Sequence, residues 1–175
     1  MNNIILIGMP GCGKSTVGVV LAKAVGYRFC DSDLLIQEKD GRLLSEIIDQ
    51  EGTEGFNRIE NEVNASIMTD HTVIATGGSV VYGREAMEHL SSIGVVVYIK
   101  LPYEEIEKRV GNLHNRGVSI RSGQTLRDLY DEREPLYERY ADLTIEVGKR
   151  TISETALYIK EQIESISAGS EKEND

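Results

Sequence analysis

The chain of 175 residues is acidic: Asp and Glu outnumber Lys and Arg by 29 to 19, for a formal net charge of -10. This length suits one folded domain, and the charge argues against non-specific attraction to nucleic acid or to an anionic membrane. No apolar run reaches the ~20 residues of a membrane span, no charged leader precedes the first apolar segment, and two cysteines are too few for a disulfide framework, so we expect a cytoplasmic protein with reduced thiols.

Short β-branched apolar runs alternate along the chain with longer amphipathic stretches. The runs predict strands at 3–8, 27–31, 72–77, 94–101 and 143–147. The amphipathic stretches predict helices at 14–25, 32–70 in pieces broken near Gly41 and Gly52, 83–92, 103–111, 124–140 and 151–166. Such alternation is typical of an α/β fold with a mostly parallel sheet between helices. We expect one domain over 1–166 and a disordered tail over 167–175, whose residues are small and charged.

The segment ILIGMPGCGKSTVG, residues 5–18, matches the phosphate-loop pattern GxxxxGK followed by Ser or Thr, and it lies between a predicted strand and a predicted helix. Glycines allow positive φ, so that backbone amides and the helix N-terminus converge on phosphate oxygens. Lys14 would supply a point charge to those oxygens and the Ser15 hydroxyl a ligand to Mg²⁺. The residues predicted to bind nucleotide here are Gly11, Cys12, Gly13, Lys14, Ser15 and Thr16.

A phosphate loop by itself does not separate a kinase from a GTPase or a motor. A GTPase needs an Asn-Lys-x-Asp segment to read guanine, and this sequence contains no Asn-Lys pair. The GTPase interpretation is therefore disfavoured.

Two carboxylates, Asp31 and Asp33, directly follow the second predicted strand, at the edge where open parallel sheets bind ligands. One could organise Mg²⁺-bound water near Ser15 while the other orients and deprotonates a substrate hydroxyl. Alternatively, Asp31 could cap the following helix, with Asp33 in its first turn favoured by the helix dipole. The spacing alone leaves both interpretations open.

The ordered set GMPGCGKST, DSD, GFNRIE (55–60), ATGGS (75–79) and REPLYERYADLTI (133–145) resembles the shikimate kinase family, within the P-loop group that is similar to nucleoside monophosphate kinases. The resemblance implies an ATP- and Mg²⁺-dependent kinase with strand order 2-3-1-4-5 and a mobile lid at about 112–123. It assigns Asp33 as the base that also holds shikimate hydroxyls, and Asp31 with Ser15 as Mg²⁺ organisers.

The resemblance also implies contacts for residues outside the phosphate loop. Gly77 and Gly78 would approach the substrate, and Arg133 would pair with its carboxylate. Arg109 would lie beside adenine, and Arg116 would reach the phosphates from the lid, which makes it a catalytic residue together with Lys14 and Asp33.

Three positions depart from the family pattern. Asn57 stands where the family usually has an arginine, Arg58 follows one position later, and Ser79 replaces the third glycine of a triplet. In a helix, Asn57 and Arg58 point ~100° apart, so Arg58 substitutes for the missing guanidinium only if it curls back. The lid has Gly117 where the family has proline. We keep Asn57, Arg58 and Ser79 as predicted substrate contacts, and expect that Asn57→Arg lowers the Michaelis constant for shikimate.

The sequence thus predicts a kinase that phosphorylates shikimate to shikimate 3-phosphate in the chorismate pathway, acting as a monomer on a small molecule. One alternative is a related kinase for another hydroxylated metabolite, such as homoserine or a sugar acid. A second is a nucleotide-binding regulator without catalysis, which is disfavoured because Lys14, Ser15, Asp31 and Asp33 are all present.

Overall fold

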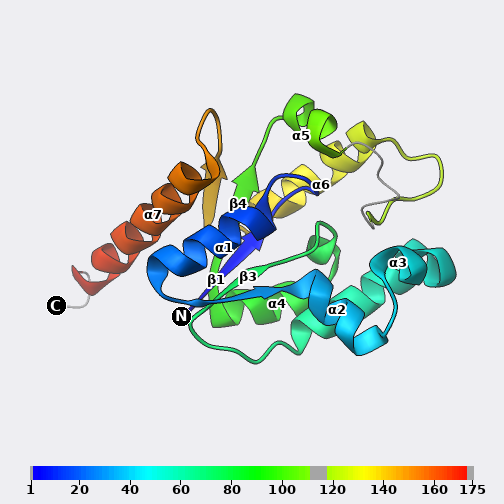
Figure 1. The fold of residues 1–175 in the computed structure, drawn as a ribbon, viewed down its shortest axis with the longest axis horizontal. Coiled ribbons are helices and arrows are strands. Elements are labelled where there is room, and N and C mark those ends of the chain that lie inside the picture. Colours follow the sequence, from blue (N-terminus) through cyan, green and yellow to red (C-terminus); the bar gives the residue numbers. More distant parts are fainter. Residues whose placement is uncertain (1, 111–117, 173–175) are drawn as a thin grey trace.

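A sheet of five parallel strands forms the centre of the computed structural model, which describes residues 2–110 and 118–172 (Figure 1). The strands are β1 (Asn3–Ile7), β2 (Arg28–Asp31), β3 (Thr72–Ala75), β4 (Gly94–Lys100) and β5 (Leu143–Glu146). Within the described residues their order is β2-β3-β1-β4-β5, and every neighbouring pair is parallel. The predicted α/β class and strand order are confirmed.

Strand β1 lies in the middle of the sheet, and all of its side chains are shielded from solvent. All five of its residues are buried, and its Ile5 pairs with Ile74 of β3 on one side and Val96 of β4 on the other. A strand covered on both faces favours a continuous β-branched run rather than an alternating pattern. This is why the sequence signal for β1 is so clear.

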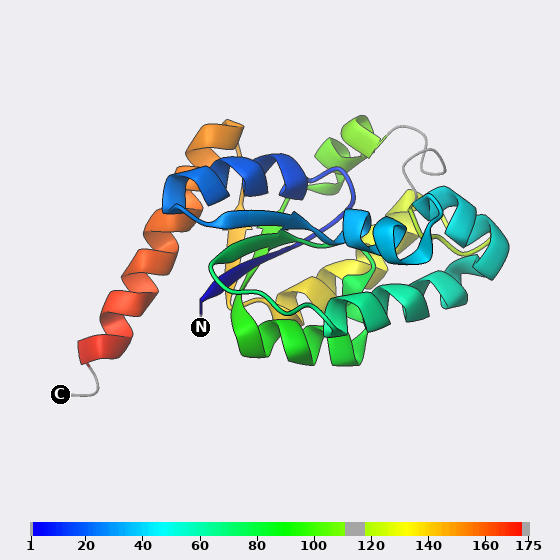
Figure 2. The ribbon, with the colours of Figure 1, turned by 60° about the horizontal axis from the view of Figure 1, so that its bottom comes forward.

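Helices cover both faces of the sheet, as the alternating pattern predicts. They are α1 (Lys14–Val25), α2 (Ser32–Asp40), α3 (Leu44–Ala65), α4 (Arg84–Ile93), α5 (Tyr103–Val110), α6 (Leu126–Tyr140) and α7 (Ile152–Lys172). Figure 2 shows α1 above the sheet, α7 sloping down one side from the level of α1, and α4 and α6 below the sheet. The packing of α1 against α7 and of α4 and α6 against β4 agrees with this three-layer arrangement.

Helices α2 and α3 project beyond the carboxyl ends of the strands and have a small apolar cluster of their own (Figure 1). The cluster joins Ile36 of α2 to Ile47, Phe56 and Val63 of α3. Both predicted breaks are confirmed, because Gly41 ends α2 with φ 83° and Gly52 interrupts α3 with φ 69°. Glycine adopts this left-handed region without steric cost.

Two features differ from the sequence prediction. A short 3₁₀ helix, η1 (Val80–Tyr82), follows the glycines after β3. Helix α7 extends to Lys172, six residues past the predicted end at 166, because adding residues to a helix that has already formed costs little, even where the added segment contains Ser and Gly. Of the predicted lid, 112–117 lies outside the described residues and 118–123 inside them. No described helix is long and apolar enough to cross a membrane.

Candidate active site

The phosphate-loop segment wraps around the N-terminus of α1 at the carboxyl end of β1. Its Gly8, Gly11 and Gly13 have φ of 146°, 80° and 101°, so all three predicted glycines occupy the positive-φ region. A Cβ on Gly8 would lie 2.7 Å from the Ile99 carbonyl oxygen, which excludes a side chain on steric grounds as well. The loop therefore has the backbone geometry of an anion cradle.

Lys14 is held across the base of this loop. Its Nζ donates hydrogen bonds to the carbonyl oxygens of Gly8 (2.7 Å) and Met9 (3.0 Å), and its side chain is only 8% exposed. Two carbonyl acceptors fix the position of the ammonium group without neutralising its charge. A buried, fixed cation is suited to binding phosphate oxygens.

Asp31 caps α2 and also contacts Ser15. Its Oδ1 accepts a hydrogen bond from the Asp33 backbone N–H (3.0 Å), which caps α2, and its Oδ2 accepts one from Ser15 Oγ (2.7 Å). The second bond links the end of β2 to the start of α1. Asp31 and Ser15 therefore place two hard oxygen donors side by side at the edge of the phosphate loop.

The phosphate loop opens onto a cavity of about 410 Å³, called here the central pocket. Its walls come from the phosphate loop, α2, α3, the glycines after β3, the segment after residue 117, and α6. The lining residues are Pro10, Gly11, Gly13, Lys14, Ser15, Thr16, Asp33, Phe56, Glu60, Thr76, Gly77, Gly78, Ser79, Val118, Ser119 and Arg133. The sequence-predicted Asp33, Gly77, Gly78, Ser79 and Arg133 thus converge on one cavity together with Lys14.

Asp33 lies in the first turn of α2 with its carboxylate in the central pocket. Burial, together with the neighbouring charge of Asp31, raises the pKa of Asp33 to about 6, while the charge of Lys14 acts in the opposite direction. A carboxylate with such a pKa is a stronger base than an exposed aspartate and is still ionised at neutral pH.

Glu60 of α3 is buried beside Asp33, with 1% of its surface exposed. Its Oε2 accepts a hydrogen bond from Ser79 Oγ (2.5 Å), whereas Oε1 has no hydrogen-bond partner among the described residues and lies against Gly77. Burial raises the pKa of Glu60 to about 7, with the Ser79 hydrogen bond acting in the opposite direction. The pocket therefore contains two carboxylates whose protonation depends on each other.

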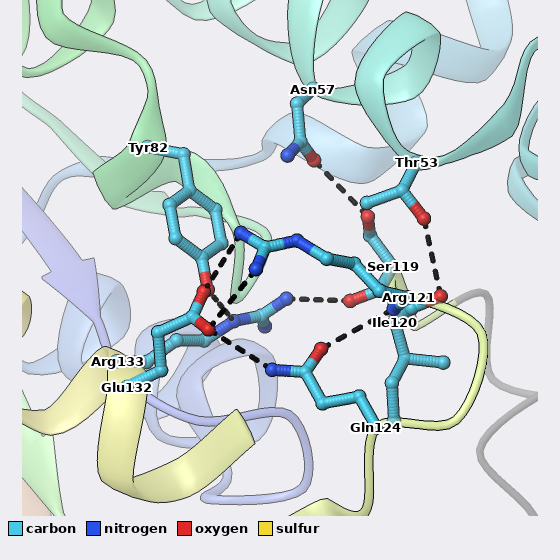
Figure 3. A network of polar contacts seen from close by, with 9 residues as sticks. All are labelled: Thr53, Asn57, Tyr82, Ser119, Ile120, Arg121, Gln124, Glu132 and Arg133. Atoms are coloured by element: carbon cyan, nitrogen blue, oxygen red, sulfur yellow. Dashed lines mark hydrogen bonds and ion pairs between the residues drawn. The ribbon is translucent and has the colours of Figure 1, made fainter. Parts of the chain in front are cut away.

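Arg133 of α6 supplies a cation on the opposite wall and is 1% exposed. Figure 3 shows its two anchoring contacts: Nη2 donates to the Ser119 carbonyl oxygen (2.7 Å) and Nε to the Tyr82 hydroxyl (3.3 Å). The guanidinium carbon lies 5.3 Å from the centre of the Tyr82 ring. Nη1 has neither of these partners and points toward Gly78, where an added Cβ would lie 3.0 Å away.

A second cavity of about 340 Å³ lies on the other side of the phosphate loop. It brings Arg109 of α5 together with the loop, and its lining is Gly11, Cys12, Gly13, Thr16, Val17, Arg109, Val147, Arg150, Ile152 and Thr155. Arg150, which sequence reasoning missed, lies with its guanidinium 4.0 Å from the ring centre of Tyr158 and donates to the Glu146 carbonyl. The cavity has room for a flat base next to two cations.

Comparison with known proteins gives matches to one family over nearly the whole chain. A family model described as shikimate kinase matches residues 10–164. The chain belongs to the shikimate kinase family. The shikimate kinase of Clostridium botulinum is 39% identical over 163 residues, covering 93% of this chain and 97% of that protein. The shikimate kinase of Thiobacillus denitrificans is 36% identical over 156 residues, covering 87% and 85%.

Solved structures agree with this assignment. Shikimate kinase from Acinetobacter baumannii, in complex with shikimate, superposes with a TM-score of 0.85 at 36% identity and 94% coverage of both chains. The Aquifex aeolicus enzyme gives a TM-score of 0.81 at 29% identity, covering 95% of this chain and 99% of that one. As a member of the shikimate kinase family, the protein is an ATP-dependent kinase that acts on a hydroxyl group.

The positions that depart from the family pattern fall in different places. Ser79 lines the central pocket, whereas Asn57 lies at its margin and accepts a hydrogen bond from Ser119 Oγ (3.1 Å). Arg58 is exposed and is not among the lining residues, because it points from another face of α3. The predicted catalytic Arg116, with Gly117, lies outside the described residues.

Sequence reasoning also missed residues that the fold brings to the pocket. Glu60 belongs to the GFNRIE motif, but the sequence alone assigns it no role. Its position four residues after Phe56, on the apolar face of α3, is a sequence signal for a buried carboxylate. Tyr82 and Ser119 carried no such signal. Their importance arises from contacts with Arg133, which is 51 and 14 residues away along the chain.

Proposed function

We propose that this protein transfers the γ-phosphoryl group of ATP to a hydroxyl group of shikimate, giving shikimate 3-phosphate. The observation that carries the proposal is the central pocket, where a phosphate loop, a buried carboxylate and a buried guanidinium share one cavity. The shikimate-bound neighbour from Acinetobacter baumannii supports the choice of acceptor.

Asp33 is the proposed general base. With a pKa of about 6 it is ionised at neutral pH, so it can accept the proton of an acceptor hydroxyl and orient that oxygen for in-line attack. The anchored ammonium of Lys14, at the base of the phosphate loop, stabilises the charge on the transferring group. Arg116 stays a predicted contributor from the lid.

Phosphoryl transfer of this kind uses Mg²⁺, which neutralises phosphate charge when it is bound. The donor set at Ser15 and Asp31 fits such an ion, because Mg²⁺ prefers hard oxygen ligands. The described residues contain no group of three or more metal-binding side chains, so phosphate and water would supply the remaining ligands. Ser15 would be the direct ligand, and Asp31 would act through water.

Arg133 is the proposed site for the acceptor's carboxylate. Its Nε and Nη2 are bound to protein acceptors, and Nη1 remains on the pocket side near Gly78. Charge-assisted hydrogen bonds to a carboxylate are about twice as strong as neutral ones. The second cavity, with Arg109 and Arg150 beside the phosphate loop, is the proposed adenine site.

A coupled assay of ADP release tests the proposal, with shikimate, quinate, homoserine, gluconate and nucleoside monophosphates as candidate acceptors. We expect ADP release that depends on shikimate and a phosphorylated product with the mass of shikimate 3-phosphate. Release driven by another acceptor would favour a related kinase. Nucleotide binding with no acceptor-dependent release would favour a regulator. The cytoplasmic location, the monomeric state and the place in the chorismate pathway stay predictions from the sequence.

A further inference from the structure

The segment from Val118 to Gln124, called here the strap, crosses from α3 to α6 along the margin of the central pocket (Figure 3). On the α6 side, Glu132 accepts hydrogen bonds from Arg121 Nη2 (3.2 Å) and Gln124 Nε2 (3.1 Å). On the α3 side, Thr53 Oγ1 donates to the Ile120 carbonyl (3.1 Å). Hydrogen bonds therefore attach the strap to α6 on one side and to α3 on the other.

Ser119 lies at the centre of the strap and contacts both walls of the pocket. Its Oγ donates to Asn57 Oδ1 (3.1 Å) on α3, and its carbonyl oxygen accepts the 2.7 Å hydrogen bond from Arg133 Nη2 on α6. Ser119 is 3% exposed, so water does not readily replace either partner. A continuous chain of hydrogen bonds thus runs from Asn57 through Ser119 to Arg133.

The other side of the Arg133 guanidinium is held by a separate set of contacts. Nε donates to the Tyr82 hydroxyl, which itself donates to Glu132 Oε1 (2.5 Å). Because Nε and Nη2 are both bound, the plane of the guanidinium is set by two hydrogen bonds that diverge. The direction of Nη1 into the pocket follows from that plane.

We infer that Asn57 and Ser119 are positioning residues: through the Ser119 carbonyl they set the direction in which Arg133 presents Nη1, on the pocket side near Gly78, to the acceptor's carboxylate. The inference rests on the proposed function. Asn57, which stands in place of a family arginine, accepts its hydrogen bond from Ser119 of the strap. In this protein a single guanidinium, oriented by a neutral hydrogen-bond chain, would bind the carboxylate for which the family usually has two arginines.

Steady-state kinetics of Asn57→Ala, Ser119→Ala and the double variant test this inference. Each single change breaks one neutral hydrogen bond, so we expect the shikimate Michaelis constant to rise about 5-fold. We expect kcat to change less than about 2-fold and the ATP constant to stay the same, because the phosphate loop is untouched. The double variant should be no worse than the more impaired single variant, because both changes interrupt one chain.

The carboxamide analogue of shikimate provides the decisive comparison. It has no carboxylate charge for Arg133 to bind, so the effect of either substitution on its Michaelis constant should largely disappear. Glu62→Gln, an exposed change on the same helix, serves as the matched control and should behave as wild type. Melting temperatures of all variants check that each is folded.

Three results would overturn the inference while leaving the proposed function standing: unchanged shikimate constants in both single variants, equal effects on shikimate and its carboxamide, or additive effects in the double variant. A wild-type protein with no shikimate-dependent ADP release would instead reject the proposed function, and the inference with it.

Discussion

Ser79 and Glu60 form a buried hydrogen bond in the wall of the central pocket, where the serine hydroxyl donates to Glu60 Oε2 over 2.5 Å. Oε1 of the same carboxylate lies against Gly77, and Asp33 Oδ1 would be 2.8 Å from a Cβ added there. Glycine at 77 is therefore required by two carboxylates that crowd it. The serine that replaces a family glycine gives one of these carboxylates a donor.

The first prediction concerns the pH dependence of catalysis. Because burial raises the pKa of Asp33 to about 6, the proposed base is protonated below that pH and ionised above it. We expect kcat/KM for shikimate to fall about tenfold per pH unit below pH 6. Asp33→Asn should lower the rate at neutral pH by at least ~10²-fold and abolish this acidic limb. A rate that is flat from pH 7 to pH 4.5 would contradict the assignment.

The second prediction concerns stability and the buried Glu60. Its pKa is about 7 in the folded protein, above the ordinary value of 4.5, so the folded state binds this proton more tightly than the unfolded chain. The stability contributed by the protonated form is present below pH 4.5 and is lost as the pH rises through 7. Glu60→Gln removes this titration, so its melting temperature relative to wild type should be at least ~2 °C more favourable at pH 8 than at pH 5.

Thermal melts at the two pH values measure this difference, with the exposed Glu62→Gln as control. Glutamine keeps an oxygen that can accept from Ser79, so the hydrogen bond itself is preserved. Parallel shifts of wild type and Glu60→Gln across the pH range would show that Glu60 does not titrate in this interval.

The third prediction concerns the phosphate loop. Lys14→Ala removes the anchored ammonium, while the glycines that shape the loop remain, so we expect an intact fold and a loss of at least ~10²-fold in kcat/KM. The exposed Lys23→Ala on the same helix loses an equal charge away from the loop and should retain wild-type rates. Full activity in Lys14→Ala, measured by ADP release, would reject the assignment of this loop.

Most of the fold could be predicted from the sequence, because the strands and helices of the sheet layers leave local sequence patterns. Strands β1, β3 and β4 are short, buried runs rich in β-branched residues, and the glycines at 41 and 52 mark real breaks, as their positive φ values confirm. The phosphate loop is likewise formed by consecutive residues, so its motif is visible in the sequence. These features need no knowledge of distant contacts, so one sequence suffices to predict them.

The site was less predictable where its chemistry depends on tertiary contacts. The Ser79 to Glu60 bond spans 19 residues and the Ser119 to Asn57 bond spans 62, so neither leaves a local pattern. Arg58 shows the converse, because its local pattern does not reveal the face on which it lies. It has the right chemistry and the right sequence neighbourhood, but the helical turn places it on an exposed face.

The last prediction returns to position 57, where the sequence alone suggests that a new arginine strengthens shikimate binding. An arginine has no acceptor for the Ser119 hydroxyl, and its own donors would instead be drawn to Ser119 Oγ, away from the carboxylate. Removing that hydroxyl should free the new guanidinium. We therefore expect Asn57→Arg to lower the shikimate Michaelis constant by about 10-fold in a Ser119→Ala background, as for one charge-assisted hydrogen bond, and by less than half that factor in the wild-type background. The test is to measure the shikimate Michaelis constants of the wild type, the two single variants and the double variant at saturating ATP. Equal gains in both backgrounds would mean that Ser119 does not compete for the residue at 57.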